Sequence, residues 1–187
     1  MKRIILLFCG TLLLASGAGA TPDPAPAQIV YGVQPTYDWQ VYAGYAFVRF
    51  YEVPKTTVDL NGFEFSISYY IPNHDWIGAE GSLLGAFGSQ LGNTATLALG
   101  MGGGRVRWTG PRGIEVWAHA LAGGAHFTPQ TPFGSQGALA FEAGGGVDLN
   151  PRHSRLALRV GADMVGTRFF STYQYSPKIS GGVVIKF

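Results

Sequence analysis

His126, Thr128 and Glu142 come nearest to a nucleophilic catalytic set in this sequence. A hydroxyl becomes a nucleophile when a base removes its proton and a carboxylate orients that base. Here a threonine supplies the hydroxyl, and the neighbouring Pro129 and Pro132 favour an ordinary connecting loop. We therefore assign no catalytic role to these residues.

Asp148 and His153 form a second possible acid–base pair. They flank Asn150 and Pro151, which are typical turn residues. We favour the interpretation that Asp148 and His153 stabilise a turn.

The histidines have no spacing that would bring metal ligands together. They are His74, His119, His126 and His153. The glycine-rich stretches 100–104 and 144–146 lie inside expected strands, whereas a phosphate-binding loop leads into a helix. The sequence therefore predicts neither a metal site nor a cofactor site.

The N-terminus has the three parts of a secretory signal peptide, which we assign to residues 1–20. Lys2 and Arg3 are followed by an apolar run, and Ala18 and Ala20 mark the expected cleavage site. Cys9 lies inside this segment, so the mature chain is expected to lack cysteine. Residues 21–38 are rich in proline and read as a linker, and residues 39–187 form the remaining domain.

The composition of the mature chain excludes some classes of function. Without Lys2 and Arg3, the 13 basic residues become 11, which equals the number of acidic residues, so nucleic acid is not an expected partner. Only 13% of the residues are charged, against about 25% in typical soluble domains. Low charge without a long apolar run is expected of a transmembrane β-barrel, whose strands are apolar on one face only.

The domain contains eight segments of about the length that a tilted strand needs to cross a bilayer. They are 39–51, 62–71, 76–86, 94–108, 114–127, 136–149, 155–165 and 175–187. Short connections at 72–75, 109–113 and 150–154 alternate with longer ones at 52–61, 87–93, 128–135 and 166–174. The sequence therefore predicts an all-β fold, an eight-stranded antiparallel transmembrane β-barrel with periplasmic turns and external loops.

Alternation within the segments predicts which side chains face lipid. In 62–71, 155–165 and 175–187, apolar residues alternate with polar ones, and the polar set must face the lumen because a lipid-facing Arg or Lys costs about 2–4 kcal/mol. The facing of 39–51 and 94–108 stays ambiguous.

A network of charges is expected in the lumen, with Arg159 and Asp163 both part of it. Its members are Glu64, Glu80, Arg105, Arg107, Glu115, His119, Glu142, Arg159, Asp163 and Lys186. A soluble barrel of the lipocalin type is disfavoured because it would bury these charges in an apolar interior.

Aromatic residues near the segment ends are expected to form girdles at the membrane interfaces. They are Trp39, Tyr51, Trp76, Trp108, Phe127 and Tyr175. Four residues of the last external connection are expected to be exposed: Arg168, Phe169, Phe170 and Tyr173.

The closing residues SGGVVIKF resemble the C-terminal assembly signal of outer-membrane barrels, with Ser180, Gly182, Ile185 and Phe187 in the matching positions. An extended last strand can pair with an open sheet edge on an assembly machine. The stretches GYAFVRF (44–50), WAHALAGGAHFTP (117–129) and 144–170 resemble the small OmpA-like barrels common in Acidobacteria. The resemblance spans residues 39–187 and implies the eight-stranded fold without an assigned activity.

We expect an integral protein of the bacterial outer membrane with a side-chain-filled lumen and a structural or surface-interaction role. The alternatives are a narrow channel and a lipid-modifying enzyme, since His126 and Thr128 resemble the His-x-Ser motif of lipid A deacylases. The expected partners are outer-membrane lipid, lipopolysaccharide, the barrel-assembly machinery and periplasmic chaperones. The external ligand is not specified by the sequence.

Overall fold

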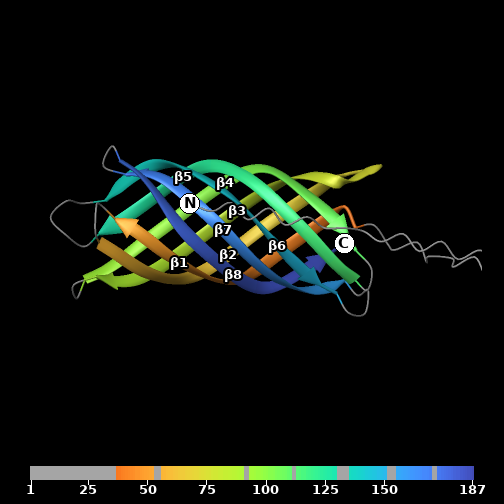
Figure 1. The fold of residues 1–187 in the computed structure, drawn as a ribbon, viewed down its shortest axis with the longest axis horizontal. Coiled ribbons are helices and arrows are strands. Elements are labelled where there is room, and N and C mark those ends of the chain that lie inside the picture. The colour runs from red at the N-terminus through yellow and green to blue at the C-terminus, as the bar shows by residue number, and fades with distance from the viewer. Residues whose placement is uncertain are drawn as a thin grey trace, which may run out of the picture. The chain divides into compact units, whose positions relative to one another are not determined.

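The computed structural model describes residues 37–52, 56–90, 93–110, 113–129, 135–150, 155–169 and 172–187. They form one closed barrel of eight strands, each antiparallel to its neighbours in sequence, with β1 paired to β8 (Figure 1). The strands are β1 Trp39–Glu52, β2 Thr56–Ile71, β3 His74–Gln90, β4 Asn93–Thr109, β5 Ile114–Pro129, β6 Gln136–Leu149, β7 Leu156–Phe169 and β8 Thr172–Lys186. The predicted fold class is confirmed. The expected signal peptide, with Ala18 and Ala20, and most of the expected linker lie outside the described residues.

The strands are strongly staggered. Successive partners around the barrel are Tyr70, Gly78, Arg105, His119, Gly144, Asp163, Lys178, Val48 and Leu60. This path leaves β2 at Tyr70 and returns to it at Leu60, ten residues away. Such a stagger requires strands tilted by roughly 35–45° to the barrel axis. It also brings side chains from distant strands into one row.

The predicted facing of β2, β7 and β8 is confirmed. On β2, Phe63 is 75% exposed whereas Glu64 is 6% exposed. On β8, Ile185 faces outward and Lys178 inward. The structure also decides the ambiguous facing of β1 and β4, whose inward sets include Gln40 and Arg105.

Several connections are shorter than the sequence predicts. β1 and β2 extend to Glu52 and Thr56, β3 and β4 to Gln90 and Asn93, and β7 and β8 to Phe169 and Thr172. The expected turn 72–75 is also shorter, because β3 begins at His74. The polar residues of 57–61 look like a loop in the sequence, but they alternate with the buried Val58 and Leu60. These stretches therefore continue the strand, with polar side chains outside and apolar ones inside.

The barrel interior has two layers. We call the end near Trp39 and Phe187 the terminal end, because the backbones of these two residues are hydrogen-bonded there. The opposite end, on the left in Figure 1 where the β1 arrow points, is the distal end. Charged side chains fill the terminal part of the interior, and an apolar cluster that includes Phe50, Leu60 and Phe127 fills the distal part. Within the described residues, no helix has the length and apolarity needed to span a membrane.

Candidate functional site

The interior charges form the main candidate site. The structure places all ten residues of the expected lumen set inside the barrel, none more than 8% exposed. Two charged residues that the sequence analysis left out of this set, Asp148 and Lys178, lie there as well. Alternation along the strands could have placed both residues in the lumen. Lys178 is next to Ile179, which faces outward, and Asp148 lies on the same inward face as Glu142.

His119 lies at the centre of this network. Its Nδ1 is 3.0 Å from Glu80, and its Nε2 is 3.1 Å from Asp163 and 3.3 Å from Glu142. Both ring nitrogens thus face carboxylate oxygens, and both can donate only in the imidazolium form. The positions follow from the register, which makes His119 the neighbour of Arg105 on β4.

Lys178 joins three carboxylates across the lumen. Its Nζ lies 2.6 Å from Glu64, 2.8 Å from Glu142 and 3.2 Å from Asp163. The ammonium has three donors, of which two are hydrogen-bonded to Glu64 and Glu142, while Asp163 forms an ion pair with it. Lys178 and His119 therefore bind the same two acidic groups, Glu142 and Asp163, from different sides.

A second group of ion pairs includes Arg159. Its guanidinium donates two hydrogen bonds of 2.7 Å to Asp148 and one of 2.9 Å to Gln40. Asp163 lies on the same face of β7, yet it pairs with His119 and Lys178 instead.

The remaining terminal charges surround Glu115. Lys186 lies 2.9 Å from Glu115, and Arg107 lies 3.9 Å away. Arg107 also donates to the backbone oxygens of Asp75 and Tyr37, which holds it at the terminal rim.

Trp117 fills the space between the ion pairs. The guanidiniums of Arg105 and Arg159 lie 4.2 and 4.9 Å from its ring centroids, and its indole nitrogen donates to Asp148. A Cβ built on Gly146 would lie 2.7 Å from the indole and 2.1 Å from the Val160 carbonyl oxygen. Only glycine at this position leaves room for the ring. The sequence analysis did not place Trp117 in the lumen.

The charges nearly balance. Among the described residues, the buried carboxylates are Glu64, Glu80, Glu115, Glu142, Asp148 and Asp163. The buried lysines and arginines are Arg105, Arg107, Arg159, Lys178 and Lys186. Six negative groups thus face five positive ones, and a protonated His119 makes the interior neutral. Neutrality matters because an uncompensated buried charge is strongly destabilising.

Three phenylalanines pack together in the distal layer. The ring centroid of Phe50 lies 5.0 Å from that of Phe127 and 6.0 Å from that of Phe169. The predictions that Phe127 is part of a girdle and that Phe169 is exposed were wrong, since both are at most 1% exposed. The strands β5 and β7 stay paired up to the distal end. Their side chains therefore continue to alternate between the lumen and the outer face where the sequence indicated loops.

The other side chains expected in the girdles or in the last external connection are exposed as far as the structure describes them, and their place at a membrane interface stays a prediction. The girdle residues Trp39, Tyr51, Trp76, Trp108 and Tyr175 are exposed on the outer face, as are Arg168 and Tyr173. Phe170 lies outside the described residues.

Among the described residues, the three candidate catalytic groups do not come together. His126 and Thr128 face outward on β5, whereas Glu142 faces the lumen. His153 lies outside the described residues, and Asp148 is bound to Arg159. His119, Glu142 and Asp163 have ligand atoms within 4.8 Å of one another, and the ammonium of Lys178 already lies 2.8 and 3.2 Å from the two carboxylates.

The expected assembly signal occupies the end of β8. Ile185 and Phe187 face outward, and Ser180 faces inward. The backbone of Phe187 exchanges hydrogen bonds of 2.9 and 3.0 Å with Trp39, which closes the barrel at its terminal end.

Comparison with known proteins identifies the fold through similar solved structures. No protein-family model and no curated protein sequence matches the chain. Neisserial surface protein A (NspA) has a similar structure, with a TM-score of 0.67, 13% identity, and coverage of 80% of this chain and 97% of that one. Ail, the attachment invasion locus protein of Yersinia pestis, matches with a TM-score of 0.57 and 15% identity over 81% of this chain and 100% of that one. A structure of Ail with the heparin analogue sucrose octasulfate matches with a TM-score of 0.53 and 16% identity over 79% of this chain and 97% of that one. The chain thus has the fold of the small outer-membrane β-barrels.

Proposed function

We propose that this protein is an integral barrel of the bacterial outer membrane with a closed interior and a structural or surface-interaction role. The observation that carries the proposal is its polarity, which is apolar outside and ion-paired inside. A soluble barrel has the opposite arrangement. The likeness to NspA and Ail supports the same location.

The outer face has an apolar belt of the kind that hydrocarbon covers. Among the described residues, outward-facing charged side chains lie three residues or fewer from a strand end. They are Arg49, Asp59, Asp75, Arg155 and Arg168. The strand centres between them carry exposed residues such as Leu83, Met164 and Ile179. Burying this belt in lipid removes a large apolar surface from water.

The interior supports a closed barrel over a narrow channel. An eight-stranded barrel is just wide enough for its own side chains. Here paired charges fill the terminal part, and the rings of Phe50, Phe127 and Phe169 fill part of the distal layer. An ion crossing the apolar layer would lose its hydration without gaining a partner.

Export and assembly follow as parts of the same proposal. We infer that the chain is cleaved after Ala20 and carried across the periplasm by chaperones. The barrel-assembly machinery then recognises Phe187 and inserts the barrel. The terminal end then faces the periplasm and the distal end faces outward, beside lipopolysaccharide. Membership of the OmpA-like family, in its acidobacterial branch, is proposed on the sequence resemblance. Ail is named for attachment, which supports an adhesive role for the distal surface.

Two measurements test the proposal. Fractionation of cells that express the full chain should place the mature protein, beginning at Thr21, in the outer membrane. The purified protein should then give no single-channel currents in planar bilayers. Steady conductance would favour the channel alternative, and recovery in the soluble periplasmic fraction would contradict the membrane location.

A further inference from the structure

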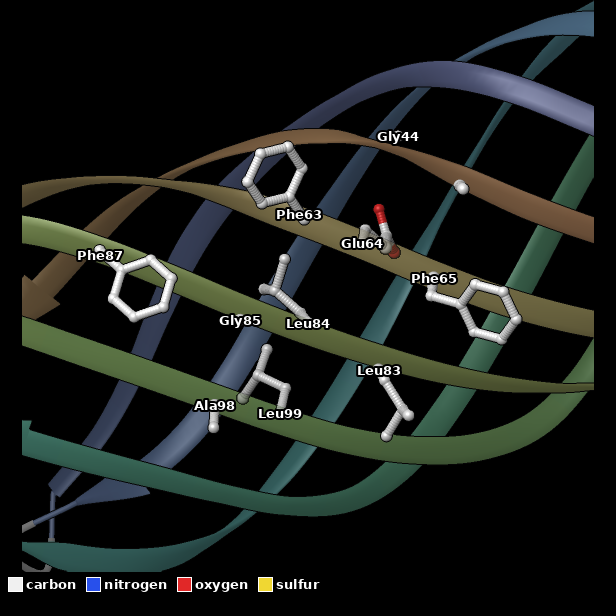
Figure 2. Close-up of a pocket in the computed structure, with 11 residues that line it drawn as sticks. Gly44, Phe63, Glu64, Phe65, Leu83, Leu84, Gly85, Phe87, Ala98 and Leu99 are labelled. Atoms are coloured by element: carbon white, nitrogen blue, oxygen red, sulfur yellow. The ribbon is translucent and has the colours of Figure 1, made fainter.

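The barrel wall has a pocket at Gly85 that is lined on the outer face by Phe63, Leu83 and Phe87 and on the inner face by Glu64, Leu84 and Leu99 (Figure 2). We call its outer part the groove. Gly85 on β3 lies between Phe63 on β2 and Ala98 on β4 in the register. Leu83 lies two residues before Gly85 on β3 and Phe87 two residues after it. Figure 2 shows these two side chains on opposite sides of Gly85, which has no side chain. A Cβ built on Gly85 would meet no atom within 4 Å. The missing side chain therefore leaves a depression between exposed apolar groups.

The groove ends at a polar rim toward the distal end. Tyr45, the register neighbour of Phe63, donates a hydrogen bond to Asn61, which lies opposite Phe87. Further along, Arg49 and Asp59 form an exposed ion pair of 3.0 Å. The apolar groove and this rim together match a molecule with a hydrocarbon chain and a polar head.

We propose that the groove binds one acyl chain of a membrane lipid, whose headgroup lies against Tyr45 and Asn61. This inference rests on the proposed membrane location. The site lies in the belt that hydrocarbon covers, next to its polar boundary. Phe63 and Leu83 are 75% and 62% exposed, so their side chains project beyond the backbone of Gly85. They would keep the wall of a second barrel from reaching Gly85. A thin, flexible chain can reach the floor, whereas a second copy of the barrel would rest on the projecting side chains.

The structure provides a matched pair of variants. Gly85→Leu places an apolar side chain in the groove, and no atom lies within 4 Å of its Cβ. Gly104→Leu is the control, since Gly104 is exposed on β4, is equally unobstructed and does not line the groove. Both substitutions add the same apolar side chain to the outer face.

The experiment uses the full mature chain in phosphatidylcholine vesicles that contain a phosphatidylcholine with a diazirine in its acyl chain. After photolysis, mass spectrometry maps the labelled residues. Labelling of Phe63, Leu83 and Phe87 should exceed that of Leu158 and Val160 by roughly fivefold, the ratio that about 1 kcal/mol of preferential contact produces. Gly85→Leu should abolish this excess, and Gly104→Leu should leave it unchanged.

Uniform labelling of the outer face would contradict lipid binding in the groove, but it would not contradict the membrane location. An equal loss in both variants would do the same. Failure of the wild type to enter the vesicles would contradict the proposed function and the lipid occupant together.

Discussion

Arg159 and Asp148 lie directly opposite each other on β7 and β6 and share two hydrogen bonds of 2.7 Å. Both side chains are at most 2% exposed. This is a two-pronged contact between a guanidinium and a carboxylate, the geometry that gives such pairs their strength. Its energetic role depends on whether one partner or both are removed.

Arg159→Leu should destabilise the barrel by about 3–5 kcal/mol, because it leaves the buried Asp148 carboxylate with only the more distant Lys186, 3.9 Å away, as a charge partner. The double variant Arg159→Leu with Asp148→Leu should recover much of this loss. Urea unfolding in detergent measures both free energies. Arg49→Leu is the control, since its pair with Asp59 is about half exposed and should contribute no more than about 1 kcal/mol. Simple additivity of the two interior substitutions would contradict the coupling.

His119 should carry protons on both ring nitrogens at neutral pH. Each nitrogen faces a carboxylate oxygen, and the imidazolium balances the buried charge. Nitrogen NMR of the protein in micelles distinguishes the two forms, with His126, exposed on the outer face, as an internal reference. A neutral ring signal for His119 would contradict the prediction.

Phe127→Ala should cost about 3–5 kcal/mol, the range for removing a phenylalanine from a packed interior. Phe127 is fully buried against Phe50 and Phe169. Leu139→Ala, at a position 77% exposed on the outer face, should cost much less in detergent. Equal losses in urea unfolding would argue against a packed distal layer.

Gly146→Ala should impair refolding, because the added Cβ would lie 2.1 Å from the Val160 carbonyl oxygen and would press on Trp117. Gly124→Ala provides the comparison, since no atom lies within 4 Å of a Cβ at that position. Refolded fraction, read from the heat-dependent shift in gel mobility, measures the effect. A normal yield for Gly146→Ala would show that Trp117 can move.

Phe187→Ala should reduce insertion in cells more than refolding in vitro. It removes the exposed ring but keeps both backbone hydrogen bonds to Trp39, so the finished barrel should lose no more than about 1–3 kcal/mol. Deleting Phe187 removes those bonds as well and serves as the comparison. The measurements are outer-membrane yield in cells and refolding yield in detergent. Equal losses of Phe187→Ala in both would mean that Phe187 acts through stability alone.

The sequence by itself determined the fold class and much of the facing. Alternation has a period of two, so Phe63 and Glu64 must point to opposite sides of the sheet wherever the strand pairs. Charge then decides which side is the lumen, because a lysine such as Lys178 is too costly against lipid.

The partners of each charge were decided only by the tertiary structure. Arg159 and Asp163 share a face of one strand, but they pair with different residues, because the stagger of ten residues sets which strands bring their charges together. The register also places Gly85 between Phe63 and Ala98, which creates the groove. Alternation along one strand contains no information about these neighbours, since they come from segments whose relative shift is fixed only when the barrel closes.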